Sequence, residues 1–549
     1  MKKQGGTFMK KVLTGVTAAM LASSIPLASL AEEESEVPGM IVEEADRSAF
    51  VYVPENIKKG DITTPILLVY GDEDYTAESA LEEAVNGGFV EIAEKNNMVV
   101  TFVNSKGDAW SDEDVENYIG IVGSMYIERP ASINTEGTDP DGLYAGYAHR
   151  IYVAAEGSGA DFVTNYLVDD SVSEFVEAWN VTMPRIPTAV MLFNGTELPQ
   201  EGLTQEYPAV IVNGSEELKS AYQTLNTTDS HFLTIETETA DGFEKEAVLE
   251  GYQVLKGVRR TLLGNDNLAV LDVPDYAALG IEELVTTRTT SQGNEVGYIL
   301  YIPDTADTTS VGTVPLVLTF HGMGENAEYF SALSTWPVTG AKNGFMTVSF
   351  DQHNTYSTAE IVEILEKLEN EYPCIDKSRI YVSGFSMGGM KTDTLSQEYT
   401  ELFAGIAPID GTSDISEIPE SELVLPMMYI AGEEDPYEGF VFPTEEGNLA
   451  NATIERIFRM NGAGDYQYDA SASNTFFGID SPDAYTVEAS AGTSVLTVSP
   501  FASEDGNVYT ALVNVSHMGH TIFVDYPDLA WDFLSHFSRN EDGTITYQE

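Results

Sequence analysis

The sequence predicts two α/β domains, each a mostly parallel sheet with helices on both faces. Short β-branched runs alternate with longer helical stretches through both halves of the 549 residues, which is the arrangement that parallel strands require. Five strand-like segments of the second half also recur in the first half, in the same order. Five matches in order are difficult to obtain from generic strand composition, so we interpret the chain as a duplication.

Each repeated segment contains one apolar, strand-like run. The matched segments, second half first, are Tyr298–Pro303 with Ala49–Pro54, Pro315–Gly322 with Pro65–Gly71, Asn343–Val348 with Asn96–Val100, Arg379–Val382 with Arg150–Val153, and Pro426–Gly432 with Pro208–Gly214. The repeat predicts a first domain at 32–265 and a second domain at 266–549, preceded by a short leader.

Apolar spacing places helices in the second domain. Residues from Ile361 to Leu368 carry apolar side chains three and four positions apart, which predicts a helix packed on the sheet. The segment from Tyr526 to Leu534, with Pro527 near its first turn, predicts a closing helix. Residues 451–510 are rich in Ala, Ser, Asp and aromatic residues, and we interpret them as a lid or specificity insert.

Residues 1–31 are typical of a bacterial secretory signal peptide. Lys10 and Lys11 give a positive start, Val12–Leu30 is apolar, and Ser29-Leu30-Ala31 resembles a cleavage site. No later segment is long and apolar enough to span a bilayer. We therefore expect a secreted, extracellular protein that has no membrane contact once the signal is cleaved.

The net charge limits the expected partners, and the cysteine content limits the expected crosslinks. The 89 acidic residues outnumber the 26 basic residues and give a formal net charge of −63, which disfavours nucleic acid and anionic membranes. Cys374 is the single cysteine, so no internal disulfide can form. The acidic runs lack EF-hand spacing, and nothing in the sequence calls for a metal or a cofactor.

One sequence motif has the features of a catalytic site. The apolar run Arg379–Ser383 is followed by Gly384-Phe385-Ser386-Met387-Gly388-Gly389, which reads as a strand, a tight turn bearing a serine, and the start of a helix. This arrangement is the nucleophile elbow of α/β-hydrolases. The hydroxyl of Ser386 needs an exposed position where a base can take its proton, and the flanking glycines allow the sharp turn. An ordinary glycine-rich turn is the alternative interpretation.

The acid of a catalytic triad should come next along the chain, since this fold orders its triad Ser, then Asp or Glu, then His. The strand-like run Met427–Ala431 leads into Gly432-Glu433-Glu434-Asp435-Pro436. We predict that Asp435 is the acid that orients the base, with Glu434 as the alternative. Asp410 follows an earlier strand and is expected to be structural.

Two histidines compete for the role of base. The strand-like run Ala511–Val515 leads into Ser516–Thr521, which contains His517 and His520. We favour His520, because it lies on a loop that can reach over the edge of the sheet. Histidine is the side chain whose proton affinity suits this exchange near neutral pH.

The oxyanion hole requires two backbone N–H groups that point at the developing negative oxygen. One should come from Met387, the residue after the serine, and we assign the other to Met323 in the loop after the first core strand. His321 is expected to hold that loop. In the first domain, the dipeptide that matches His321-Gly322 is Tyr70-Gly71.

The first domain lacks this constellation of residues. In register, Ser386 corresponds to Gly157, Ser158 lies one position late, and Asp435 corresponds to Glu217. No histidine follows the last predicted strand, so a serine there would stay protonated and unreactive. We interpret this half as a degenerate, non-catalytic α/β-hydrolase-like domain; a second working site that uses Ser158 is the alternative.

Together these residues resemble the polyhydroxybutyrate depolymerase and feruloyl-esterase-like branch of the α/β-hydrolases. The resemblance covers most of 290–549 and is carried by His321–Gly324, Ser378–Gly389, Ala431–Pro436 and Gly519–Thr521. It implies secreted carboxylic-ester hydrolysis without a cofactor. The substrates it implies are feruloyl or acetyl esters of plant polysaccharide, or short polyesters.

The leading hypothesis is therefore a secreted serine carboxylesterase that uses Ser386, His520 and Asp435, with the Met323 and Met387 amides as the oxyanion hole. A serine peptidase of the same fold is the rival within enzymes. A non-catalytic binding protein built from two hydrolase-like domains is the rival from another class.

Overall fold

The computed structural model describes the chain between residues 37 and 548, with internal gaps. The described ranges are 37–58, 61–127, 146–168, 174–176, 181–183, 186–198, 206–226, 228–238, 242–265 and 267–548. The second domain is thus described almost completely. The signal peptide predicted at 1–31 lies outside the described residues.

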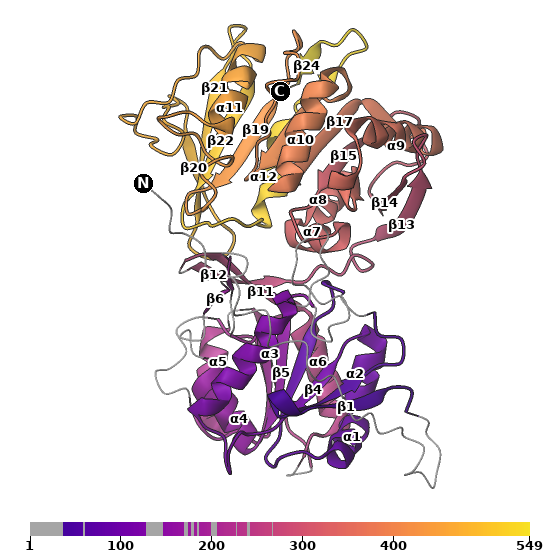
Figure 1. Cartoon of the computed structure of the whole chain (residues 1–549), viewed down its shortest axis with the longest axis vertical. Coiled ribbons are helices and arrows are strands. Elements are labelled where there is room, and N and C mark those ends of the chain that lie inside the picture. Colours follow the sequence, from indigo (N-terminus) through magenta and orange to yellow (C-terminus); the bar gives the residue numbers. More distant parts are fainter. Residues whose placement is uncertain are drawn as a thin grey trace, which may run out of the picture.

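The first half contains an eight-stranded sheet, drawn in indigo to magenta in Figure 1. Its strands are β1 (Met40–Glu44), β2 (Ala49–Val53), β3 (Ile66–Tyr70), β4 (Val100–Val103), β5 (Ile151–Glu156), β8 (Ala189–Phe193), β9 (Ala209–Val212) and β10 (Phe232–Ile235). Their spatial order is β1-β2-β4-β3-β5-β8-β9-β10. A separate two-stranded pair joins β6 (Glu174–Val176) to β7 (Val181–Met183).

The second half contains a ten-stranded sheet. Its strands are β13 (Ile281–Thr289), β14 (Glu295–Pro303), β15 (Val314–Phe320), β16 (Met346–Phe350), β17 (Ile375–Phe385), β18 (Gly405–Ile409), β19 (Met427–Gly432), β20 (Tyr485–Glu488), β21 (Val495–Ala502) and β22 (Val508–Val515). Their spatial order is β13-β14-β16-β15-β17-β18-β19-β22-β21-β20.

Both sheets have the same topology. When the strands of each sheet are numbered along the chain, with β22 as the eighth strand of the second sheet, both orders read 1-2-4-3-5-6-7-8. In both sheets the first two strands pair antiparallel and the third to eighth strands pair parallel. The second sheet adds β21 and β20 as an antiparallel edge. This is the α/β-hydrolase arrangement, so the predicted fold class is confirmed.

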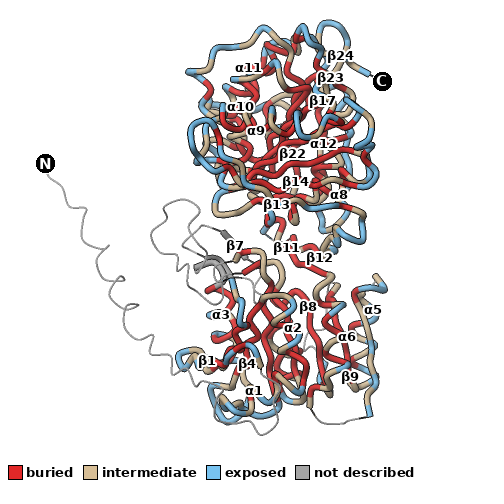
Figure 2. Tube along the Cα trace, turned by 90° about the vertical axis from the view of Figure 1, so that its right-hand side faces the viewer, coloured by how far each residue is buried: buried red, intermediate tan, exposed pale blue. Residues whose placement is uncertain are grey.

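Helices cover both faces of each sheet (Figures 1 and 2). In the first half they are α1 (Ala77–Asn86), α2 (Phe89–Asn96), α3 (Val115–Ile127), α4 (Ser158–Phe162), α5 (Glu216–Leu225) and α6 (Lys245–Lys256). In the second half they are α7 (Ala327–Ser334), α8 (Trp336–Asn343), α9 (Thr358–Glu371), α10 (Met387–Glu398), α11 (Leu449–Met460) and α12 (Asp525–Leu534). The helices predicted within 361–368 and 526–534 are confirmed as α9 and α12.

The core of the second half forms two apolar layers. Side chains of α9, α10 and α11 pack on one face of the sheet, and side chains of α7, α8 and α12 pack on the other. Burial on both faces explains why the parallel strands are apolar along their whole length. Cys374 is a buried member of the first layer. Among the described residues, none of the helices combines the length and the apolar character that a membrane crossing requires.

A two-stranded hairpin connects the halves. It consists of β11 (Val258–Gly264) and β12 (Asn267–Asp272), and it lies between the two sheets in Figures 1 and 2. The boundary predicted at 265/266 falls in the sequence between these two strands. The chain ends in a second small hairpin, formed by β23 (Phe537–Arg539) and β24 (Ile545–Tyr547), which follows α12.

Candidate active site

The backbone at Ser386 is bent sharply between β17 and α10. Ser386 has φ 53° and ψ −113°, a conformation that L-residues rarely adopt and that costs of order 1–3 kcal/mol. The neighbouring backbone leaves no room for a side chain at position 384 or at position 388. A Cβ on Gly384 would lie 2.3 Å from the carbonyl oxygen of Gly388, and a Cβ on Gly388 would lie 2.0 Å from that of Phe320. The two glycines are therefore required by close backbone contacts.

Three side chains meet at this turn. The Nε2 atom of His520 lies 2.8 Å from the Oγ atom of Ser386, and its Nδ1 atom lies 2.5 Å from Oδ2 of Asp435. The Asp435 side chain is fully buried, whereas that of His520 is 17% exposed. Neutral histidine with its proton on Nδ1 donates to the carboxylate and can accept the serine proton at Nε2. The geometry thus fits proton transfer from a serine hydroxyl.

The alternative acid and base lie elsewhere. Glu434 accepts a hydrogen bond from the backbone amide of Asn265, at 2.8 Å. The His517 side chain is exposed, and its residue has a positive φ of 53° at the start of the loop that carries His520. The structure therefore brings Asp435 and His520 to Ser386, and it places Glu434 and His517 in other contacts.

Asp410 is a further buried carboxyl group beside Asp435. Its Oδ1 atom accepts a hydrogen bond from the backbone amide of Gly432, at 2.9 Å. Burial, and then the charge of Asp435, raise the pKa of Asp410 well above its usual range. Atoms of Asp410, Asp435 and His520 that could ligate a metal lie within 4.8 Å of one another. A neutral carboxyl is a poor metal ligand, and both ring nitrogens of His520 are already engaged, so the cluster fits acid–base chemistry better.

Replacing Asp410 with asparagine should preserve most of the activity, because an amide reproduces the size and neutrality of a protonated carboxyl. The folded wild type holds this proton more tightly than the unfolded chain, so its free energy of unfolding falls as the pH rises above about 4, where the unfolded carboxyl ionises. In wild type this decrease in the free energy of unfolding is at most about 1.4 kcal/mol per pH unit, and the contribution should be absent in Asp410→Asn. Urea unfolding of both proteins at about pH 4.5 and about pH 7.5 measures the difference in their pH dependence. Equal pH dependence of the two proteins would contradict a neutral Asp410.

The predicted oxyanion loop is held by two buried histidines. His321 donates from Nδ1 to the carbonyl oxygen of Gly322, at 2.7 Å, and its Nε2 accepts from the amide of Gln352, at 3.1 Å. His353 donates from Nε2 to the carbonyl oxygen of His321, at 2.7 Å. Burial lowers the pKa of both rings, so they stay neutral. This agrees with a loop-holding role for His321, whereas the sequence pattern did not identify His353.

The two predicted oxyanion donors belong to segments that pack against each other near Ser386. Met387 is the first residue of α10, so its amide belongs to a helix N-terminus, where N–H groups have no partner within the helix. Met323 lies in the histidine-held loop, and the residue is 53% exposed. The loop packs closely on the turn, since a Cβ on Gly322 would lie 2.9 Å from the ring of Phe385.

Aromatic rings that the sequence analysis did not identify surround His520. The ring centroid of Tyr437 lies 4.7 Å from that of the imidazole, the centroid of Phe385 lies 4.8 Å from it, and that of Phe440 lies 6.4 Å from it. Tyr437 and Phe440 come directly after the turn of Asp435, so proximity in sequence was a signal that could have found them. Their rings partly shield the imidazole from water.

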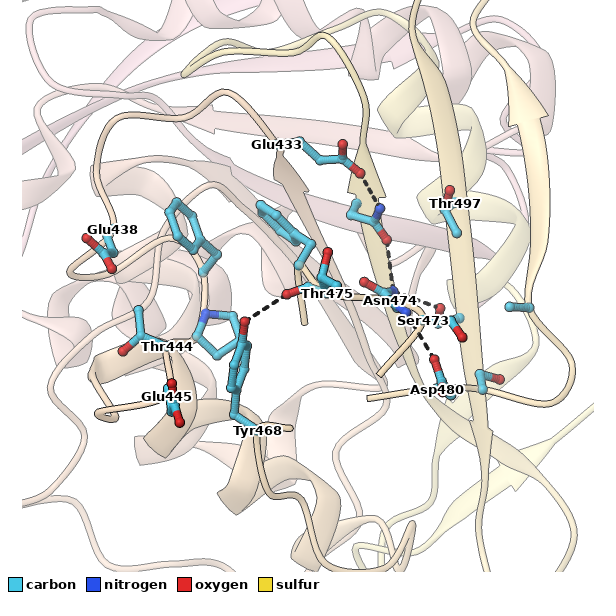
Figure 3. Close-up of a pocket in the computed structure, with 17 residues that line it drawn as sticks. Glu433, Glu438, Thr444, Glu445, Tyr468, Ser473, Asn474, Thr475, Asp480 and Thr497 are labelled. Carbon is cyan, nitrogen blue, oxygen red and sulfur yellow. Dashed lines mark hydrogen bonds between the residues drawn. The ribbon is translucent and has the colours of Figure 1, made fainter. Parts of the chain in front are cut away.

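A cleft of about 940 Å³ opens next to the turn that carries Asp435 (Figure 3). Glu433 and Glu438, which flank Asp435 in the sequence, both line the cleft. Much of the remaining wall comes from 468–484, inside the segment predicted as a lid or specificity insert. That segment begins within α11 and also contributes the edge strands β20 and β21.

Polar side chains of the cleft are connected by hydrogen bonds. Asn514 donates to Glu433, and Asn474 donates from its amide group to Asn514, at 3.1 Å. The backbone amide of Asn474 donates to Asp480, at 3.0 Å. The ring of Tyr468 also lines the cleft, and its hydroxyl donates to the carbonyl oxygen of Thr475 (Figure 3). The cleft therefore combines an aromatic surface with several hydrogen-bond acceptors.

The first half has a similarly bent backbone at the position that corresponds to Ser386. Gly157 lies between β5 and α4 with φ 55° and ψ −121°, close to the values of Ser386. The oxyanion loop is also recognisable, but its predicted alignment is wrong by one position. Tyr70 ends β3 and pairs with Ala155, as Phe320 ends β15 and pairs with Gly384, so Tyr70 corresponds to Phe320.

In the first half, the carboxylate of Asp72 lies at the amide that corresponds to that of Met387. The amide of Ser158, which corresponds to that of Met387, donates to Oδ1 of Asp72 at 2.8 Å, and the Ser158 hydroxyl donates to the Asp72 carbonyl oxygen at 3.1 Å. Glu217, the counterpart of Asp435, is exposed in the first turn of α5. An amide that already binds a carboxylate is not free to bind an oxyanion.

Similar proteins include esterases and a depolymerase. Residues 343–476 match the prolyl oligopeptidase family. The bifunctional acetylxylan esterase/xylanase XynS20E of Neocallimastix patriciarum is 28% identical over 130 residues, which cover 22% of this chain and 19% of that protein. Poly(3-hydroxyalkanoate) depolymerase C of Paucimonas lemoignei is 30% identical over 115 residues, which cover 18% of this chain and 28% of that protein. The chain thus spans less than a third of the length of these two relatives.

Solved structures with some likeness are also esterases. An acetyl xylan esterase from Aspergillus awamori aligns over 46% of this chain and 98% of its own, with 15% identity and a TM-score of 0.31. A thermostable esterase aligns over 32% of this chain and 51% of its own, with 24% identity and a TM-score of 0.27. Each of these matches covers less than half of this chain.

Proposed function

We propose that the protein is a serine carboxylesterase. The observation that carries the proposal is the hydrogen-bonded series Ser386–His520–Asp435 at a strained turn. Ser386 attacks the ester carbonyl while His520 takes its proton and then returns it to the leaving alcohol. Asp435 orients the imidazole and stabilises its cation. The amides of Met323 and Met387 bind the oxyanion, and water then releases the acid from the acyl-enzyme.

We further propose that the alcohol part of the substrate lies in the cleft beside Asp435. A volume of about 940 Å³ is at the upper end of the range for small-molecule sites, so it suits a bulky or polymeric alcohol. Four carboxylates line the cleft: Glu433, Glu438, Glu445 and Asp480. They repel anionic groups and accept hydrogen bonds from hydroxyl groups, while the ring of Tyr468 offers an apolar face. This chemistry favours a neutral, hydroxyl-rich alcohol such as the polysaccharide of a polysaccharide ester.

The first half is proposed to be non-catalytic. The contacts between Asp72 and Ser158, together with the exposed position of Glu217, support this role. Secretion is part of the same proposal and rests on the composition of residues 1–31.

A serine peptidase is the second candidate, and the match of residues 343–476 to the prolyl oligopeptidase family is the observation that favours it. Both reactions use the same nucleophile and base. They differ in the leaving group, which is an alcohol in one case and an amine in the other.

Replacing Tyr468 with alanine tests the ester proposal and the role of the cleft together. We expect wild type to hydrolyse p-nitrophenyl acetate and acetylated xylo-oligosaccharides, but no peptide anilide. Tyr468→Ala should lower kcat/KM for the oligosaccharide esters about tenfold, since loss of an aromatic contact costs about 1.4 kcal/mol. It should leave p-nitrophenyl acetate unaffected, because that small ester does not fill the cleft.

Tyr468→Phe is the matched control, because it keeps the ring and removes only the hydroxyl bond to Thr475. It should behave like wild type. Hydrolysis of a peptide anilide without ester hydrolysis would favour the peptidase. Equal losses on both esters in Tyr468→Ala would place the alcohol outside the cleft.

A further inference from the structure

The hairpin between the two halves has one face buried against each of them. Side chains alternate along a strand, so odd and even positions of the hairpin point in opposite directions. In β12, Ala269 and Leu271 pack in an apolar cluster of the second half, whereas Leu268 and Val270 pack in clusters of the first half. The hairpin is therefore enclosed between the two domains.

The same alternation continues in β11. Arg259 is buried and donates to the carbonyl oxygen of Leu333 in the second half, at 3.0 Å. Arg260 is also buried, and its guanidinium lies 4.4 Å from the ring centroid of Tyr207 in the first half. Arg259 also donates to the hydroxyl of Tyr147 in the first half, at 3.3 Å, so the two buried arginines tie the hairpin to both domains.

The tip of this hairpin contacts the loop that carries His520. The amide of Gly519 donates to the carbonyl oxygen of Leu263, at 2.6 Å. The side-chain amide of Asn267 donates to the carbonyl oxygen of His517, at 2.9 Å. The two contacts therefore hold the backbone immediately before His520 at two points.

Asn267 is well placed to hold this loop rigidly. It is 2% exposed, and its Oδ1 atom accepts from the amide of Thr493, at 2.8 Å. Its side-chain amide also donates to Oγ of Ser494, at 2.8 Å. The hairpin tip reaches the acid turn as well, through the amide of Asn265 and the carboxylate of Glu434, the residue before Asp435.

We propose that the β11–β12 hairpin braces the catalytic base, and that Asn267 is a positioning residue for His520. This inference rests on the proposed function, because it assigns the hairpin that joins the two halves a role in the same reaction. His520 lies on a loop between β22 and α12, so no ladder of strand hydrogen bonds fixes it. A displacement of about 1 Å can lower the rate of an enzyme about 100-fold, so the position of this loop matters for the proton transfer.

Two substitutions perturb the brace by different routes. Asn267→Ala removes the donor to His517. Gly264→Ala keeps that donor but adds a Cβ that would lie 2.3 Å from the carbonyl oxygen of His517, where backbone atoms cannot move aside cheaply. Both variants should displace the loop and leave Ser386 and the cleft in place.

Asn461→Ala is the matched structural control. Asn461 is 1% exposed, and its side chain bonds to backbone atoms of Leu425 and Tyr509. Leu425 precedes β19, so these bonds lie at the end of the sheet opposite Asp435, which follows that strand. Asn461→Ala should lower Tm without altering the position of His520.

The experiment uses the full chain and three measurements: ester kinetics, thermal unfolding, and hydrogen exchange of the amides in 516–521. We expect Asn267→Ala and Gly264→Ala to lower kcat about 10- to 100-fold with little change in KM, and to accelerate exchange at Gly519. Asn461→Ala should change neither kcat nor the exchange rate of the Gly519 amide, even though its Tm is lower. Unchanged kcat and exchange in both hairpin variants would overturn the brace.

Hydrogen exchange separates this inference from the proposed function. If wild type hydrolyses no ester, the proposed function fails, while the exchange rate of the Gly519 amide still shows whether Asn267 holds the loop. If wild type is an esterase and only Tm changes in the hairpin variants, the hairpin is structural and the positioning role is refuted.

Discussion

Replacing Ser386 with alanine should lower ester hydrolysis by about 10⁴- to 10⁶-fold. Loss of a serine nucleophile removes the acyl-enzyme route entirely, and what remains is the modest acceleration from binding and the oxyanion hole. The change removes only the hydroxyl group at a partly exposed position, so it leaves no buried cavity. The backbone strain at this residue persists with alanine, and we expect Tm to change little.

Fluorophosphonate labelling gives a second measurement, because the probe reacts with an activated serine. Wild type should be labelled and Ser386→Ala should not. Ser158→Ala is the matched control, since Ser158 lies one position after the corresponding turn of the first half and bonds to Asp72. It should retain both activity and labelling. Equal labelling of wild type and Ser386→Ala would refute Ser386 as the nucleophile, and loss of labelling in Ser158→Ala would place it in the first half.

The shared strand order of the two sheets was predictable because the strands are locally encoded. Apolar runs that repeat in order specify the same strand order in both sheets, and the glycines at 384 and 388 specify the turn between strand and helix. The alignment of Tyr70 failed by one position because the compared segments were matched by a shared glycine rather than by strand pairing. Pairing between strands depends on neighbours that are distant in sequence.

The remaining features depend on contacts between distant segments. The raised pKa of Asp410 arises from burial beside Asp435, and the sequence alone does not reveal burial. Asn267 lies 250 residues before His517, and nothing in either local sequence indicates their contact. The composition of residues 451–510 predicted a lid or specificity insert, but only the packing of 468–484 shows that part of this segment lines the cleft.

The kcat values of His520→Asn and His517→Asn should differ by several orders of magnitude. Both substitutions remove an imidazole from the same loop, and asparagine tolerates the positive φ of 53° at position 517. The His520 ring contacts Ser386 at 2.8 Å, so its loss removes the base and should lower kcat about 10⁴- to 10⁶-fold. The His517 side chain is exposed, and only its carbonyl oxygen takes part in the contact with Asn267.

His517→Asn should therefore retain activity close to that of wild type, because the backbone carbonyl is unchanged. Steady-state kinetics on p-nitrophenyl acetate, with Tm as a check on folding, distinguishes the two variants. A large loss in His517→Asn together with a small loss in His520→Asn would exchange their roles. Comparable small losses in both would contradict general-base catalysis from this loop, even if Ser386 is labelled. The contacts of the two rings predict that His520→Asn is folded but inactive, whereas His517→Asn is active.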